Sequence, residues 1–123
     1  DLRFIPIIGG TVGGALTGKV LAGGGDWQTV WPDGRMEIAA HYVLDIDGHG
    51  TVEVRSDGVR HGPPAVLEAM ARGEAVDPAS YYFRTAVRLR TAAAGLSHLN
   101  ALLAVATGER GADRVRLCVF ELS

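Results

Sequence analysis

An aspartate and a tryptophan directly after three consecutive glycines form the pattern most suggestive of chemistry in this sequence. Gly23, Gly24 and Gly25 precede Asp26 and Trp27. Because glycine tolerates positive φ and close approach of other groups, this backbone can lie against a small ligand. A carboxyl whose pKa is raised by apolar surroundings can act as a general acid or base. The alternative is a turn aspartate that binds local amides, with the indole packed in the core.

A second candidate segment, residues 81–91, alternates between two kinds of side chain. One set is Tyr81, Phe83, Thr85, Val87 and Leu89, and the other is Tyr82, Arg84, Ala86, Arg88 and Arg90. If the second set faces a cavity, Arg84 can hold a carboxylate or stabilise an oxyanion beside Tyr82. If the first set faces the core, the arginines form a solvated face. The sequence leaves both orientations open.

Two further side chains have a polar tip that needs a partner. Tyr42 lies in an alternating strand, and a hydroxyl inside a barrel would donate either to the protein or to a ligand. His61 precedes Gly62 and Pro63, where it either caps a helix or lies at the mouth of a pocket. Both residues are therefore candidate contacts for a small molecule.

Motifs for metals and common cofactors are missing from the sequence. The four histidines (His41, His49, His61 and His98) have no paired spacing and Cys118 is the only cysteine, so we expect no metal site. The glycine pairs at 9–10 and 13–14 are not followed by a helix, which argues against a dinucleotide fingerprint. No serine lies in a G-x-S-x-G motif. We expect no cofactor.

The elements that must position these residues are mostly short strands. The 17 glycines separate apolar stretches, and strands are expected at 3–8, 15–22, 28–31, 36–46, 81–91, 101–107 and 114–122, with another after residue 50. A three-residue loop at 48–50 would pair Ile46 with Val52 and Leu44 with Val54. That register places His41, Asp45, Glu53 and Arg55 on one face, with Arg55 able to pair with Asp45.

One short helix is expected after Pro63 and Pro64, since proline suits the first helical turn. Val66, Leu67 and Met70 form its apolar stripe, Glu68 and Arg72 are spaced to pair, and Gly73 can end it. The turn at 31–34 has proline at its second position and glycine at its fourth. About eight strands and one helix favour an all-β, antiparallel β-barrel, because closure removes exposed edges.

Composition narrows the class of protein and its partners. A chain of 123 residues predicts a single domain spanning 1–123, and 47% hydrophobic with 21% charged residues is typical of a globular protein. A net charge of −2 gives no basic patch for nucleic acid, and no apolar run is long enough to span a membrane. A lone cysteine and an N-terminus without a signal-peptide pattern predict a cytoplasmic protein.

Several motifs together resemble the DUF3237 family of unknown function. They are Gly9-Gly10, Gly24-Gly25-Asp26-Trp27-Gln28, Asp33-Gly34, Gly58-Val59-Arg60-His61-Gly62-Pro63, Asp77-Pro78 with Tyr81-Tyr82-Phe83-Arg84, Leu99-Asn100 and Thr107-Gly108-Glu109-Arg110. The resemblance covers nearly the whole chain and implies a barrel similar to those of allene oxide cyclase and lipocalins. It adds Asn100 to the candidate site. Relatives have an acid where this chain has Arg90 and an additional N-terminal segment, so Asp1 is expected to follow a further strand.

Two functions from different classes remain open at this stage. The first is a cofactor-independent isomerase or cyclase acting on an apolar metabolite, with Asp26 and Arg84 as catalytic residues. Its pocket residues would be Trp27, Tyr42, Tyr82, His61 and Asn100. The second is a non-catalytic ligand-binding or homo-oligomeric assembly module. Convergence of Asp26, Tyr82 and Arg84 around an apolar cavity would favour the first function, and a filled barrel would favour the second.

Overall fold

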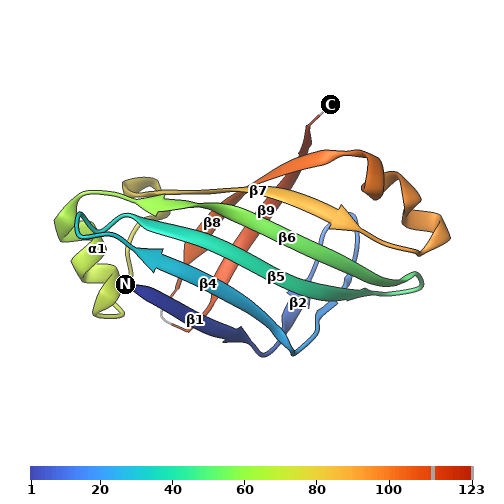
Figure 1. The fold of residues 1–123 in the computed structure, drawn as a ribbon, viewed down its shortest axis with the longest axis horizontal. Coiled ribbons are helices and arrows are strands. Elements are labelled where there is room, and N and C mark those ends of the chain that lie inside the picture. Colours follow the sequence, from blue (N-terminus) through green and yellow to red (C-terminus); the bar gives the residue numbers. More distant parts are fainter. Residues whose placement is uncertain (112, 123) are drawn as a thin grey trace.

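The computed structural model describes residues 1–111 and 113–122, which form one antiparallel sheet with one α-helix (Figure 1). Seven strands follow one another across the sheet: β1 (Leu2–Ile7), β4 (Gly24–Val30), β5 (Met36–Ile46), β6 (Gly50–His61), β7 (Tyr82–Arg90), β8 (Leu103–Arg110) and β9 (Val115–Leu122). The hairpin of β2 (Gly10–Val12) and β3 (Gly18–Val20) pairs with the end of β5 through β3. The predicted all-β antiparallel architecture is confirmed.

The sheet curls but does not close. β8 and β9 cross behind the layer formed by β4 to β7 (Figure 1), and Leu117 of β9 packs against the buried cluster that contains Met36 and Ile38 of β5. Among the described residues no pairing joins β1 to β9, the two ends of the strand order. The predicted closed barrel is therefore replaced by an open, barrel-like sheet with a concave and a convex face.

The hairpin of β5 and β6 is the longest element, and its faces agree with the predicted alternation. Met36 and Ile38 of β5 and Val52 and Val54 of β6 are buried on the concave side. The loop is residues 47–49, closed by a hydrogen bond of 3.0 Å from the His49 amide to the Ile46 carbonyl. The predicted loop at 48–50 was therefore wrong by one residue.

The observed register pairs Leu44 with Val52 and Tyr42 with Val54. The predicted partners differ from these by two residues, and a shift of two leaves every side chain on its predicted face. Arg55 consequently lies opposite His41 instead of near Asp45, so the expected Arg55–Asp45 pair is not formed. His41 instead contacts Glu53, at 3.0 Å from Nε2 to Oε2.

Helices cover the two ends of the curled sheet (Figure 1). At one end, α1 (Pro64–Ala71) buries Met70 against Met36 and Phe83, and Gly73 follows it with a φ of +78°. The predicted helix, its apolar stripe and its glycine terminator are confirmed, but Arg72 pairs with Glu74 instead of Glu68. The 3-10 turn η1 (Pro78–Ser80) leads into β7, and η2 (Ala94–Ala101) buries Leu96 and Leu99 at the other end.

The glycine run opens a strand instead of ending one. Of the predicted strand 15–22, only β3 is formed, and β4 begins at Gly24. Gly23 has a φ of +108°, and a side chain at Gly24 would place its Cβ 2.6 Å from Cβ of Tyr42. The run therefore allows both a sharp turn and a close approach of β4 to β5, directly before Asp26.

Candidate functional site

Asp26 lies on the concave face of the sheet. In β4, Asp26 is opposite Ala40 of β5, and Ala40 lies on the same face as the buried Met36 and Ile38. The Gln28 side chain donates from Nε2 to Oδ2 of Asp26 at 2.8 Å. The other carboxylate oxygen, Oδ1, is buried and accepts no hydrogen bond from the described residues. The carboxyl thus has one acceptor oxygen unused.

Burial sets the protonation of this carboxyl. Desolvation raises the pKa of Asp26 above its ordinary value of 3.8, against the smaller opposing effects of the Gln28 hydrogen bond and the positive charge of Arg60. A carboxyl with a raised pKa holds its proton closer to neutral pH. Such a group is suited to exchange a proton with a bound molecule.

Tyr42 lies on the same concave face, and the charge of Asp26 affects its pKa. Its position in β5, opposite Val54, directs the half-buried side chain toward the same concave side. Burial raises the pKa of the phenol, and the negative charge of Asp26 raises it further. The hydroxyl therefore remains protonated and can donate a hydrogen bond.

Arg60 contributes a positive charge to the concave face, as Arg3 of β1 and Arg110 of β8 also do. It lies opposite Met36 on β5 and Phe83 on β7, with its Cζ atom 6.0 Å from the centre of the Phe83 ring. Its Nε is buried and donates to none of the described residues. Burial lowers the pKa of this guanidinium and the neighbouring charge of Arg110 lowers it further, yet arginine remains protonated in proteins. Arg60 is a charged donor without a partner at Nε.

Reasoning from the sequence alone did not select Arg60 for the site. Its signal was present: in β6 the residues at even positions from Val52 to Arg60 share the concave face, so period-two alternation leads from buried valines directly to this arginine. The alternation was not followed as far as Arg60, because Gly58 interrupts the apolar residues at the even positions of this strand.

The residues predicted from the arginine-rich strand lie on the convex face. Phe83, Thr85 and Val87 are buried, so Tyr82 and Arg84 point outward, and the solvated-face alternative is the one observed. The Arg84 guanidinium lies 5.2 Å from the centre of the Tyr82 ring, and Nη1 donates to the carbonyl of Phe83. Asp26, Tyr82 and Arg84 therefore do not converge, contrary to the expectation for the enzyme.

Trp27 and His61 also occupy the convex face. Alternation in β4 directs Trp27 away from Asp26, and the indole is 52% exposed beside the Phe4 ring, at 4.7 Å between ring centres. His61 stacks on Tyr82 at 5.1 Å and lines a surface hollow of about 370 Å³ with Asp33 and Arg35. The start of α1 has no side-chain cap, so His61 does not cap this helix.

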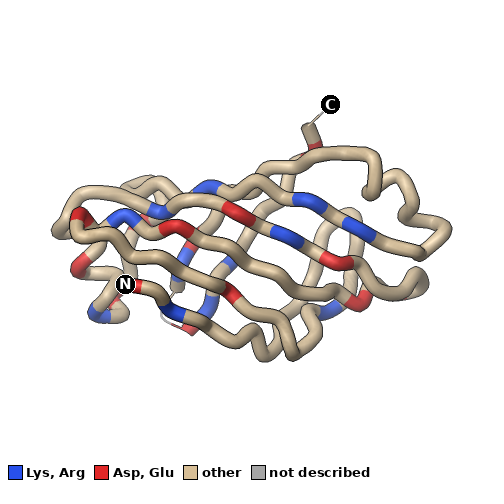
Figure 2. Tube along the Cα trace, viewed as in Figure 1, with Lys and Arg blue, Asp and Glu red and all other residues tan. Residues whose placement is uncertain are grey.

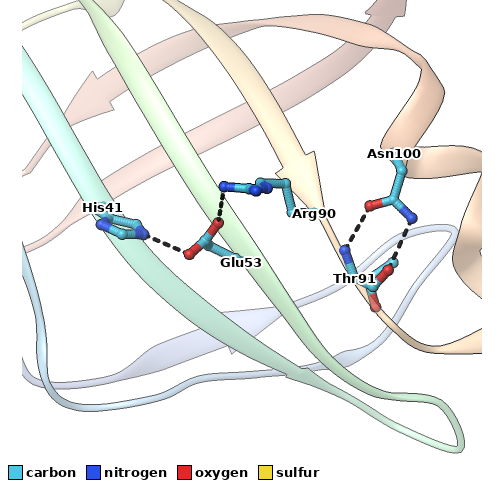
Figure 3. Close-up of polar contacts among 5 residues, drawn as sticks. All are labelled: His41, Glu53, Arg90, Thr91 and Asn100. Carbon is cyan, nitrogen blue, oxygen red and sulfur yellow. Dashed lines mark hydrogen bonds and ion pairs between the residues drawn. The ribbon is translucent and has the colours of Figure 1, made fainter.

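Asn100 links η2 to the end of β7 (Figure 3). Its Oδ1 accepts from the Thr91 amide at 2.8 Å, and its Nδ2 donates to the Thr91 carbonyl at 2.9 Å. It also donates to the carbonyl of Ser97. Asn100 therefore stabilises the connection between β7 and η2, and none of its hydrogen bonds goes to Asp26.

Charged residues of both signs are interspersed along β5, β6 and β7 (Figure 2), and Glu53, Arg55 and Arg90 among them lie on the convex face. Glu53 lies between His41 and Arg90, with 3.5 Å separating its Oε1 from Nη1 of Arg90 (Figure 3). These contacts lower the pKa of Glu53, the hydrogen bond to His41 most of all. Because the groups are exposed, this network contributes little to stability.

Neither a metal-binding cluster nor a membrane-spanning helix occurs among the described residues. No group of three or more histidine, cysteine, aspartate or glutamate side chains there could hold a metal ion. No helix among them has the length and apolar character needed to cross a bilayer.

The chain forms an open antiparallel sheet with a concave, partly polar face, which is the architecture of a barrel-like β protein. The model of the family described as "Protein of unknown function (DUF3237)" matches residues 1–122, and the chain belongs to this family. It is 42% identical over 120 residues to the UPF0311 protein blr7842 of Bradyrhizobium diazoefficiens, a match that covers 98% of this chain and 79% of the relative.

Solved structures of relatives have the same fold. The conserved protein of unknown function RPA1785 from Rhodopseudomonas palustris superposes with a TM-score of 0.92 at 36% identity, covering 98% of this chain and 87% of that chain. A structure described as a β-barrel-like protein from Acinetobacter baumannii has a TM-score of 0.84 at 35% identity, covering 99% and 78%.

Proposed function

We propose that the concave face binds a small molecule that has an apolar body and one oxygen. This oxygen is either anionic already or is a carbonyl oxygen that becomes anionic on enolisation. The observation that carries this proposal is a pair of buried polar atoms without partners on that face, Oδ1 of Asp26 and Nε of Arg60. Leaving buried polar groups unpaired costs about 1–3 kcal/mol each, so such groups require a reason. A ligand oxygen that accepts from Nε of Arg60 and shares a proton with Oδ1 of Asp26 supplies such a reason.

The same arrangement supports proton transfer without a cofactor, as in an isomerase or cyclase. Asp26 would take or give the proton, because burial raises its pKa toward the working range. The Tyr42 hydroxyl and the Arg60 guanidinium would stabilise an oxyanion that forms on the substrate. In this proposal Arg60 takes the role that the sequence had suggested for Arg84.

Binding is tested with benzoate, cyclohexanecarboxylate and the neutral control benzamide, followed by amide and side-chain chemical shifts. Benzoate or cyclohexanecarboxylate should perturb Tyr42 and residues of β4 and β6, and benzamide should not. Arg60→Gln should weaken carboxylate binding about tenfold or more, since a charge-assisted hydrogen bond contributes about 1.5–3 kcal/mol. Arg84→Gln, on the convex face, is the matched control and should leave binding unchanged. Equal loss in both variants, or no binding by any acid, contradicts the proposal.

The second candidate, a homo-oligomeric assembly module, is favoured by a separate observation. The convex side of β8 and β9 exposes an apolar patch, in which Leu103 is opposite Leu122 and Val105 is opposite Phe120. Contiguous exposed apolar surface of this kind marks interaction sites. Sedimentation of the wild type and Phe120→Glu tests it: a dimer that the variant converts to a monomer supports assembly, and a monomeric wild type excludes it.

A further inference from the structure

Two further arginines lie on the concave face with Arg60, and each comes from a different strand. Arg3 of β1 is opposite Gln28, whose side chain binds Asp26 on this face. Arg110 of β8 lies on the same side as the buried residues of that strand, because they occur at every second position before it. The strands β1, β6 and β8 therefore each place one guanidinium group on the concave face.

Arg60 and Arg110 lie near each other at the end of the sheet that α1 covers. Both border one buried cluster, which contains Met36, Ile38, Met70, Tyr81 and Phe83. Cζ of Arg60 lies 6.0 Å from the centre of the Phe83 ring, and Arg110 donates from Nη1 to the Met70 carbonyl at 3.0 Å. Burial lowers the pKa of Arg60 most, and the positive charges of Arg110 and Arg3 lower it further. The three arginines thus form one region of positive charge.

Acidic side chains do not balance these charges among the described residues. Neither Arg60 nor Arg110 forms an ion pair with any of them. Arg3 pairs with Asp1, at 3.8 Å from Nε to Oδ2, and both groups are exposed. Asp26 is near Arg60, but burial raises the pKa of this carboxyl and so favours its neutral form. Like charges held close together repel each other, and a bound anion would offset that repulsion.

We propose that the ligand of the concave face is a dicarboxylate with an apolar body between its two acid groups. One carboxylate binds Arg60 beside Asp26, as in the proposed function, on which this inference rests. The second carboxylate binds Arg110. The Met70 carbonyl uses one side-chain N–H of Arg110, and arginine has five such donors, so a pair of them remains for the bidentate contact that suits a carboxylate.

Matched pairs of ligands test for the second acid group. Phthalate, isophthalate and terephthalate differ in the distance between their carboxylates, and the monomethyl ester of each has nearly the same size with a single charge. Titrations followed by chemical shifts should show that one of the three dicarboxylates binds at least about tenfold more tightly than its own ester, because it gains a charge-assisted hydrogen bond. If benzoate binds and no dicarboxylate binds more tightly than its ester, this inference is overturned and the proposed function is retained. If no acid binds, both fail.

Arg110→Gln tests which group binds the second carboxylate. The preferred dicarboxylate should bind this variant only as tightly as its ester binds the wild type. Benzoate should bind as before, which also shows that the variant is folded. Arg88→Gln removes the same charge from the convex face of β7 and is the matched control, so it should bind the dicarboxylate as the wild type does. Three results would overturn the proposal: a preference that survives Arg110→Gln, an equal loss in Arg88→Gln, or a loss of benzoate binding in Arg110→Gln, which would make the role of Arg110 structural.

Discussion

At the scale of single residues, Asp26 shows how burial outweighs local stabilisation. One carboxylate oxygen has its partner in Gln28 and the charge of Arg60 is near, but desolvation still raises the pKa. The ionised form is therefore less favourable in the folded protein than in the unfolded chain, where water solvates the carboxylate. A residue held in this way is a poor contributor to stability and a good proton carrier.

This imbalance predicts how stability depends on pH. The folded protein binds the Asp26 proton more tightly than the unfolded chain does. Lowering the pH through the raised pKa, toward the ordinary value of 3.8, therefore stabilises the wild type relative to Asp26→Asn, which has no such proton. Urea denaturation of both proteins between neutral pH and about pH 4 should show the difference shifting in favour of the wild type. A difference that does not change with pH, or that shifts the opposite way, contradicts this assignment.

At the scale of elements, β6 and β7 approach each other so closely at Gly58 that no side chain fits between them. A Cβ at Gly58 would fall on the carbonyl oxygen of Arg84 and lie 2.7 Å from Cα of Thr85. The buried hydroxyls beside it bridge the two strands, with Ser56 donating to Thr85 at 2.8 Å. Backbone cannot move aside as the end of a flexible side chain can, so this position is restricted to glycine.

Gly58→Ala should therefore reduce the free energy of unfolding by about 1–3 kcal/mol, the range for overpacking a core. Gly13→Ala is the matched control, because a Cβ there meets nothing within 4 Å. Its effect should stay within about 0.5 kcal/mol, as for other surface substitutions. Chemical denaturation of the two variants measures both values. Similar losses at the two positions would show that the glycine content, and not the close approach, is responsible.

The connection through η2 makes a second element-scale prediction. Asn100→Ala removes three hydrogen bonds to backbone groups of Thr91 and Ser97 and should cost about 1 kcal/mol of stability. Amide exchange should accelerate in residues 94–101 and stay unchanged in β5. Ser97→Ala is the control, since Ser97 accepts from Asn100 through its carbonyl and not its hydroxyl. Uniformly faster exchange throughout the sheet would argue against a local role.

At the scale of the whole molecule, the open sheet predicts a gradient of protection. β5, β6 and β7 each have a neighbouring strand on both sides, whereas β1 and β9 each have one. The burial of side chains follows the same order, because the β9 residues other than Leu117 are exposed. Stability against local opening should therefore decrease from the middle of the sheet to its two edges.

Native-state hydrogen exchange measures this gradient directly. Amides in β5 and β6 should exchange slowest, and those in residues 2–7 and 115–122 fastest. Dilution of the sample should leave the order unchanged if the chain is a monomer. Slow exchange in β9 that disappears on dilution would show instead that a second copy covers this edge.

The sequence by itself predicted most of the strands, the alternation of side chains in the long ones, and the family. Local features could be predicted from the sequence because they act within a few residues. Examples are the period-two alternation in Met36–Ile46 and the helix boundaries set by Pro63, Pro64 and Gly73. Even the two-residue error in the β5–β6 pairing preserved the faces, because side-chain direction repeats every two residues.

Only the tertiary structure decided which side of each strand is concave and whether the sheet closes. Arg84 and Arg60 occupy alternating strands of similar composition, and the fold places the first on the convex face and the second on the concave face that Asp26 shares. Closure depends on pairing between β1 and β9, at opposite ends of the chain. Such contacts are set by the packing of all the strands between them and leave no local trace in the sequence.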